Sequence, residues 1–185
     1  MQEIIANAPN PLRTIVTITA VLGLRIGETL ALRVADIDFT KKVVCIRQSV
    51  DAATRTIAGV KSKASSADLP MPRQLETRLR AYLEGHDGKS ELLLFTNQRG
   101  RPYSANKLRA DVLHPLLMRL GIPRGGWHAM RHGTASSLLA DGATPAVVQR
   151  QLRHSDAKIT LEHYSHAIGD AQRIAVENRS ARLVN

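Results

Sequence analysis

Apolar side chains dominate the segment from Leu12 to Leu22, with only threonines and one arginine between them. Such a segment predicts a mostly apolar helix. Gly23 interrupts the pattern, and a second helical stretch is predicted over residues 27–33. Residues 7–11 contain two prolines and predict a linker into the first of these helices.

The pattern changes in residues 43–50, where β-branched side chains become frequent. Two further extended segments are predicted at residues 56–60 and 68–71. Together the three segments predict a small antiparallel sheet. A sheet of this size is marginally stable alone, so we expect it to pack against helices.

The remainder of the chain favours helices. Pro72 suits the first turn of a helix that ends near Gly85, and Ser104 is a candidate N-cap for a helix to Leu120. Thr144 is a candidate cap as well. Further helices are predicted over residues 128–140, 145–153, 155–164 and 167–180. We therefore predict an α+β fold, a mainly helical domain with a small three-stranded antiparallel sheet.

The charge of the chain narrows its possible partners. Lys and Arg total 26 and Asp and Glu total 16, which leaves a net charge of +10. Such an excess attracts polyanions, of which DNA is the commonest large one. Aromatic residues make up only 3% of the chain, which disfavours binding of single strands by base stacking. Charge alone also fits a structural RNA-binding protein.

Cys45 is the only cysteine, so a disulfide within the chain is excluded. It lies in an apolar run, and we expect a core position rather than a nucleophile. The N-terminus lacks a signal pattern, and no apolar run is long enough to cross a membrane. We therefore expect a cytoplasmic protein.

Cleavage of a phosphodiester without a metal requires fixed cations, a nucleophile and an acid for the leaving oxygen. Arginine suits the first task because its planar fork binds phosphate, and tyrosine can serve as the nucleophile. Three stretches supply such groups. Arg25 lies between two glycines, which let the backbone approach a ligand closely. The others are Trp-His-Ala-Met-Arg-His (residues 127–132) and the segment 152–166 with its single tyrosine.

Each stretch alone has an ordinary interpretation, namely a solvated arginine, a polar helix start or a tyrosine at the rim of the core. Their order is more specific. Gly-Leu-Arg-x-Gly-Glu, His-x-x-Arg-His, Leu-x-His-Ser and Tyr-Ser-His follow one another in residues 23–166. This set resembles the catalytic domain of the tyrosine recombinase, or phage integrase, family over residues 12–167.

The resemblance implies a role for each matching residue. Arg25 and Arg131 match the two arginines that clamp the scissile phosphate. Tyr164 matches the nucleophile that forms a 3′-phosphotyrosine. His128 matches a position with acid–base or phosphate-binding work, and His154 a position that hydrogen-bonds the phosphate.

Two more groups are implied by the same resemblance. Glu28 matches an acidic position that orients its neighbours. Lys61 is our choice for the lysine that protonates the leaving oxygen, and Lys63 is the second choice. Two residues depart from the family pattern: Asp68 replaces a basic residue, and Arg153 replaces a glycine. Asp68 is expected to weaken DNA contact, and Arg153 either displaces His154 slightly or adds a phosphate contact.

The resemblance also implies a domain organisation and partners. Residues 1–185 are expected to be one catalytic domain, without the N-terminal core-binding domain usual in the family. Residues 168–185 are expected to form a C-terminal helix that packs on its own domain or docks on a neighbouring protomer. The implied assembly is a homotetramer on double-stranded DNA, with no metal, cofactor or membrane. Alone, this domain is expected to bind DNA weakly.

Other functions remain open at this point. They are a DNA-binding module without catalysis, a type IB topoisomerase-like enzyme, and a metal-dependent nuclease that uses some of the seven histidines. The histidines lie beside arginines rather than with carboxylates at ligand spacing, which disfavours a metal site. The residues do not decide between integration, excision and resolution. They also leave open whether Tyr164 cuts DNA bound by its own protomer or by a neighbour.

Overall fold

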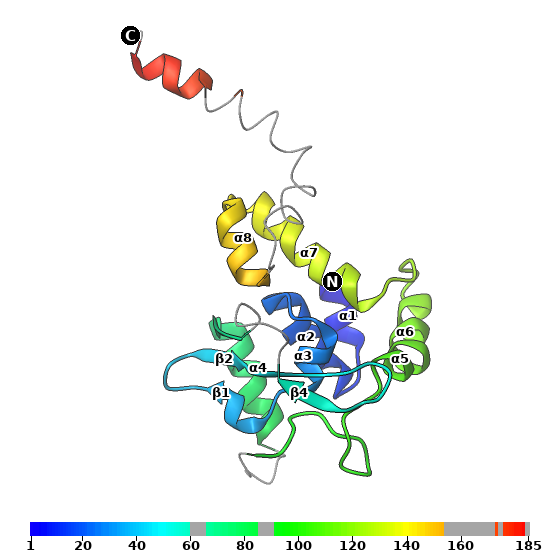
Figure 1. The fold of residues 1–185 in the computed structure, drawn as a ribbon. Coiled ribbons are helices and arrows are strands. Elements are labelled where there is room, and N and C mark those ends of the chain that lie inside the picture. Colours follow the sequence, from blue (N-terminus) through cyan, green and yellow to red (C-terminus); the bar gives the residue numbers. More distant parts are fainter. Residues whose placement is uncertain (60–65, 85–90, 154–172, 174–175, 184–185) are drawn as a thin grey trace.

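The chain folds as a group of helices with two small antiparallel sheets beside them (Figure 1). The computed structural model describes residues 1–59, 66–84, 91–153, 173 and 176–183. The mainly helical α+β fold is as predicted. The helices are α1 (Gln2–Asn7), α2 (Leu12–Leu22), α3 (Ile26–Leu30), α4 (Arg73–Leu83), α5 (Ala105–Leu108), α6 (His114–Arg119), α7 (Trp127–Ala140) and α8 (Pro145–Leu152). A 3-10 turn covers Val34–Asp36, and residues 176–183 are also helical.

Local signals in the sequence account for several helix ends. α2 covers the predicted residues, and Gly23 ends it with a φ of 67°, a left-handed conformation that glycine adopts without strain. Ser104 and Thr144 cap α5 and α8 as predicted. Their side-chain oxygens accept the backbone N–H groups of Lys107 and Val147, respectively.

Two helical features differ from the prediction. α1 was not predicted, although it buries Ile4 and packs against α2. The single helix expected from Ser104 to Leu120 is divided into α5 and α6 by a π-helical turn at Arg109–Leu113. The helix predicted over residues 155–164 lies outside the described residues, as does most of segment 167–175.

The strands form two sheets rather than the expected one. They are β1 (Ile37–Asp38), β2 (Val43–Ile46), β3 (Gln48–Val50), β4 (Ile57–Gly59) and β5 (Ala67–Pro70). β1, β2 and β5 form a three-stranded antiparallel sheet, whereas β3 pairs with β4 in a separate one. The predicted strand over residues 43–50 divides at the exposed Arg47. Its guanidinium donates to the backbone oxygens of Ile46 and Ala67 at 3.2 Å, where the ladder between β2 and β5 ends.

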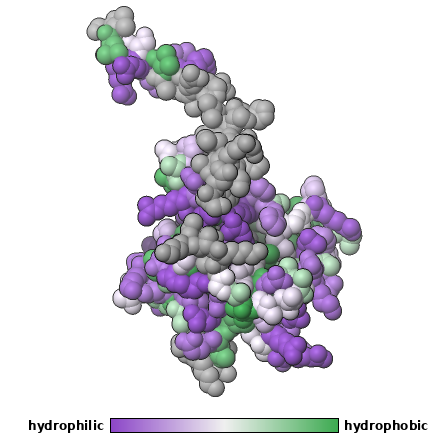
Figure 2. All heavy atoms as spheres, in the orientation of Figure 1, coloured by the Kyte–Doolittle hydropathy of each residue, from purple (hydrophilic) through white to green (hydrophobic). Residues whose placement is uncertain are grey.

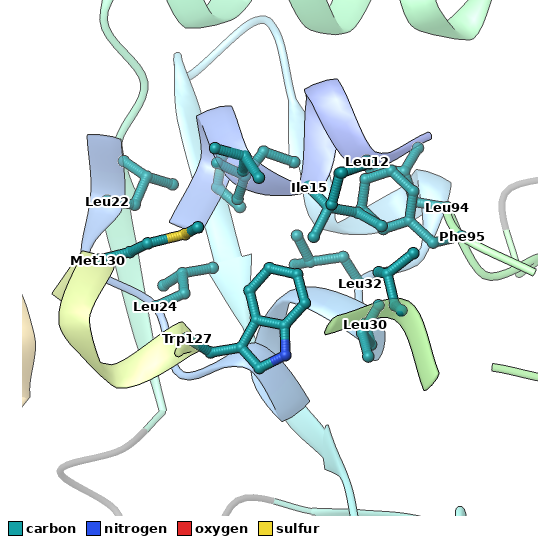
Figure 3. Close-up of a cluster of buried hydrophobic side chains, with 14 of the residues drawn as sticks. Leu12, Ile15, Leu22, Leu24, Leu30, Leu32, Leu94, Phe95, Trp127 and Met130 are labelled. Atoms are coloured by element: carbon teal, nitrogen blue, oxygen red, sulfur yellow. The ribbon is translucent and has the colours of Figure 1, made fainter. Parts of the chain in front are cut away.

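One hydrophobic core joins helices that are distant in the sequence. Leu12, Ile15 and Leu22 of α2 are at most 1% exposed. Figure 3 shows them in one cluster with Trp127 and Met130 of α7. On the face drawn in Figure 2, hydrophobic side chains form only small patches among hydrophilic ones. In the described part of the chain, no helix combines the length and hydropathy that a membrane-spanning segment needs.

Gly23 and Gly27 allow other elements to pack close to the segment between α2 and α3. A Cβ atom on Gly23 would lie 2.3 Å from Cδ2 of Leu152. A Cβ on Gly27 would lie 2.6 Å from the backbone oxygen of Val50. We expected these glycines to let the backbone approach a ligand closely; in the structure both of them pack against other elements, Gly23 against α8 and Gly27 against β3.

Gly23→Ala is expected to lower the free energy of unfolding by about 2–4 kcal/mol, because alanine adds a left-handed backbone penalty and a steric clash. Gly121→Ala is the matched control. Gly121 has a φ of 66°, but nothing lies within 4 Å of its Cβ position. The control should therefore lose only about 1 kcal/mol. Urea denaturation measures both, and equal losses would contradict the packing role of Gly23.

Candidate functional site

Arg25 lies at the N-terminus of α3 and is held there by Glu28. Oε2 of Glu28 accepts the backbone N–H of Arg25 at 2.8 Å, and Oε1 accepts Nη1 of the Arg25 guanidinium at 3.0 Å. The Glu28 side chain is 2% exposed, whereas that of Arg25 is 43% exposed. The buried carboxylate thus fixes both the backbone and the side chain of Arg25, and part of the guanidinium still faces solvent.

Arg131 lies in α7 and is buried. Its Nη1 donates to the backbone oxygen of Gly23 at 2.5 Å, and its Nη2 donates to that of Leu152. These bonds tie α7 to the end of α2 and to the end of α8. Burial, together with the nearby Arg25, lowers the pKa of Arg131 to about 10. The guanidinium therefore remains charged at neutral pH.

Arg153 is a third arginine at this place. Its Nη2 donates to Oε2 of Glu28 at 2.5 Å, and both side chains are at most 2% exposed. Burial lowers the pKa of Arg153, and the Glu28 carboxylate opposes that shift. A phosphate contact is one of the two effects expected of Arg153 from the sequence, but the structure buries this side chain against Glu28 instead.

These four side chains form one charged cluster. Arg25 and Glu28 come from α3, Arg131 from α7 and Arg153 from the end of α8, and electrostatic interactions link Arg131 to the other three. Three positive charges and one negative charge leave the cluster with a net charge of +2. A cluster of this charge with a half-exposed arginine can bind an anion such as a phosphate group.

His128 lies in the first turn of α7, one turn before Arg131, and it is exposed. The neighbouring Trp127 sets this turn, because its indole N–H donates to the backbone oxygen of Ala105 at 3.0 Å. The structure therefore brings Arg25, Glu28 and Arg131 together, and it places His128 on α7, the helix that carries Arg131. The other predicted site residues, Lys61, Lys63, His154 and Tyr164, lie outside the described residues.

Asp68 and Cys45 form a separate group on β2 and β5. Asp68 pairs with Arg47, and this hydrogen bond, together with one from Cys45, lowers the pKa of Asp68. Cys45 is half-buried rather than in the core as expected, because it alternates with the buried Val44 and Ile46 along β2. Burial raises the pKa of its thiol, as does Asp68. A raised pKa makes a thiol a poorer nucleophile at neutral pH.

No group of three or more His, Cys, Asp or Glu side chains that could hold a metal ion occurs among the described residues.

Comparisons with known proteins point to one family. The model of the phage integrase family matches residues 1–169. A tyrosine recombinase XerC-like protein of Caldanaerobacter subterraneus is 30% identical over 178 residues, covering 84% of this chain and 45% of that protein. Tyrosine recombinase XerA of Thermococcus kodakarensis is 30% identical over 165 residues, covering 84% of this chain and 53% of that protein. The chain thus spans about half the length of these curated relatives.

A solved structure supports the same fold. The Tn1549 transposon integrase, in complex with circular intermediate DNA, superposes with a TM-score of 0.80 at 23% identity. The match covers 95% of this chain and 62% of that one.

Arg131→Lys is expected to lower the free energy of unfolding by about 2 kcal/mol, because a lysine cannot donate to both backbone oxygens with the geometry of the guanidinium fork. Arg150→Lys on the exposed surface of α8 is the control and should change stability by less than about 0.5 kcal/mol. Urea denaturation compares the two variants. A loss at Arg131 no larger than that at Arg150 would show that the two bonds do not hold the elements together.

Proposed function

Because the chain belongs to the phage integrase family, whose model matches residues 1–169, we propose that it is the catalytic part of a tyrosine-type site-specific recombinase. In this function it cuts and rejoins double-stranded DNA through a covalent bond to Tyr164. The observation that carries the proposal is the convergence of Arg25 and Arg131 beside Glu28. Arg131 binds the backbone of Gly23 across 108 residues of chain and interacts electrostatically with Arg25, and these are the two side chains that the proposal assigns to the phosphate.

The proposed cleavage is a displacement at one phosphodiester. The phenol oxygen of Tyr164 attacks the phosphorus, the new P–O bond forms, and the bond from phosphorus to the 5′ oxygen breaks. Lys61, or Lys63 as second choice, gives the leaving oxygen its proton, and His128 is the candidate acceptor of the phenolic proton. Rejoining is the reverse reaction, in which a 5′-hydroxyl attacks the phosphotyrosine. Because the covalent bond retains the energy of the broken one, neither ATP nor a metal is required.

In this proposal, the arginines stabilise the negative charge of the phosphate. Arg25 and Arg131 bind the non-bridging oxygens, on which negative charge grows in the transition state. Arg131 uses one N–H of each Nη on a backbone oxygen, which orients the guanidinium and leaves other N–H groups for an anion. His154 adds a hydrogen bond. Each preorganised donor of this kind is worth about 10²- to 10³-fold in rate.

Double-stranded DNA is the proposed partner. The net charge of +10 and the complex of the Tn1549 integrase with circular intermediate DNA support this choice. A homotetramer, exchange of the tail over residues 168–185, a cytoplasmic location and a role in a mobile element belong to the same proposal. So does the assignment of residues 1–185 to a single catalytic domain.

Tyr164→Phe is expected to abolish a covalent protein–DNA adduct. The chain is incubated with nicked duplexes of random sequence, which trap a cleaved strand because the short released piece diffuses away. Wild-type protein should give an adduct that survives a denaturing gel and the presence of chelator, and Tyr164→Phe should give none.

Tyr103→Phe is the matched control for this experiment and should form the adduct normally. An adduct that persists in Tyr164→Phe would refute the nucleophile, and one that chelator removes would favour a metal-dependent enzyme. Relaxation of supercoiled DNA without exchange of strands would instead indicate a topoisomerase-like function.

Lys61→Ala is expected to slow cleavage about 10²- to 10⁴-fold at a sequence recovered from the adduct, because the 5′ oxygen then leaves without a proton. The same DNA with sulfur in place of that 5′ oxygen should be cleaved at nearly the wild-type rate, because a thiolate leaves without protonation. Lys63→Ala is the comparison. If only Lys63→Ala shows the defect and its rescue by sulfur, Lys63 is the acid instead.

A further inference from the structure

Arg153 occupies a backbone position that ordinarily suits glycine. It follows the last residue of α8 with a φ of 55° and a ψ of 44°, the left-handed conformation that crowds a Cβ atom. Its side chain is also 1% exposed. A buried charge on an unfavourable backbone conformation requires contacts that offset both costs.

The contact that offsets the cost of burying Arg153 is its ion pair with Glu28. Nη2 of Arg153 donates to Oε2 of Glu28 at 2.5 Å, and Nη1 donates to the backbone oxygen of Gln151 at 3.2 Å. Nε of Arg153 has no hydrogen-bond partner among the described residues. Oε1 of Glu28 meanwhile accepts from Arg25 at 3.0 Å. One buried carboxylate is thus shared by a buried guanidinium and a half-exposed one.

This sharing decides how much positive charge Arg25 presents to a ligand. With Arg153 in place, the charge of Glu28 is balanced inside the buried pair, and the charge of Arg25 remains available at the surface. Without Arg153, the buried carboxylate would be left to Arg25. The attraction between Glu28 and Arg25 would be strong in these surroundings of low dielectric constant. The charge of Arg25 would then be neutralised by Glu28, and its guanidinium would be less available to a ligand.

We propose that Arg153 is a positioning residue that pairs with Glu28 and thereby leaves the charge of Arg25 free for a DNA phosphate. The inference rests on the proposed function, in which Arg25 binds the scissile phosphate. Arg153 does not contact the DNA in this scheme, because its side chain is buried.

The test measures the affinity of the chain for a short duplex of random sequence at a series of salt concentrations. Arg153→Gly removes the guanidinium and places the preferred residue in the left-handed conformation. Affinity should fall about tenfold, which is the effect of losing one charged hydrogen bond. The slope of log K against log salt concentration should become shallower by about 0.9, the value for one lost phosphate contact.

Two further combinations of substitutions distinguish this positioning role of Arg153 from a purely structural one. Glu28→Gln combined with Arg153→Gly removes the carboxylate that would capture Arg25, so affinity and slope should rise above those of Arg153→Gly alone. This double variant removes both members of the buried pair, so neither Glu28 nor Arg153 is left without the other, and the test stays valid if Arg153→Gly alone does not fold. In Arg25→Gln, the further change Arg153→Gly should have almost no effect on affinity, because Arg153 acts through Arg25.

Three results would overturn the proposal. They are wild-type affinity and slope in Arg153→Gly, failure of Glu28→Gln to raise the affinity of Arg153→Gly, and additive losses from Arg153→Gly and Arg25→Gln. The proposed function is judged separately by the covalent adduct. Tyr164→Phe abolishes the adduct but leaves a phosphate contact by Arg25 in place, so the catalytic proposal and the role of Arg153 can fail independently.

Discussion

A buried carboxylate, that of Glu28, is the interaction on which the site depends. It binds the backbone and the guanidinium of Arg25 at the start of α3 and the guanidinium of Arg153 at the end of α8. A carboxylate without cations is very unfavourable at 2% exposure, and removal of one partner from such a pair typically costs about 3–5 kcal/mol. Arg131 brings α7 to the same place through the backbone oxygens of Gly23 and Leu152. The contacts that hold these helices together therefore also set the positions of the cations.

The cluster carries more positive than negative charge, and this imbalance has a functional meaning. Arg25 and Arg153 both disfavour the charged form of Arg131, and Glu28 only partly opposes them. An anion placed against Arg25 and Arg131 would relieve that repulsion. Cations that are fixed in place stabilise a transition state whose negative charge increases. The electrostatics of the cluster thus favour an anion, which the proposed function takes to be a phosphodiester.

How far the sequence predicts the fold depends on the range of each interaction. The end of α2 at Gly23 and the caps at Ser104 and Thr144 arise from contacts within a few residues, so the sequence alone predicts them. The division into two sheets could not be predicted, because it depends on which distant segment each strand meets, as when Ile46 pairs with Ala67. α1 was not predicted from the sequence, for a different reason. A helix of six residues with one buried side chain, Ile4, is too short to show periodicity.

Contacts between distant segments were even harder to predict in the candidate site. The order of the motifs pointed to Arg25, Glu28 and Arg131. However, neither the segment around Glu28 nor the segment around Arg153 indicates that these two side chains meet across 125 residues of chain. Arg153 was visible in the sequence only as a departure from a glycine, and taken alone it looks like a defect or an additional phosphate contact. In the structure, the buried charge at position 153 is paired with one carboxylate, which is also the carboxylate that holds Arg25. The two positions are therefore physically coupled: an arginine at 153 is tolerable because an acid stands at 28, and the acid at 28 can hold Arg25 without neutralising it because an arginine stands at 153.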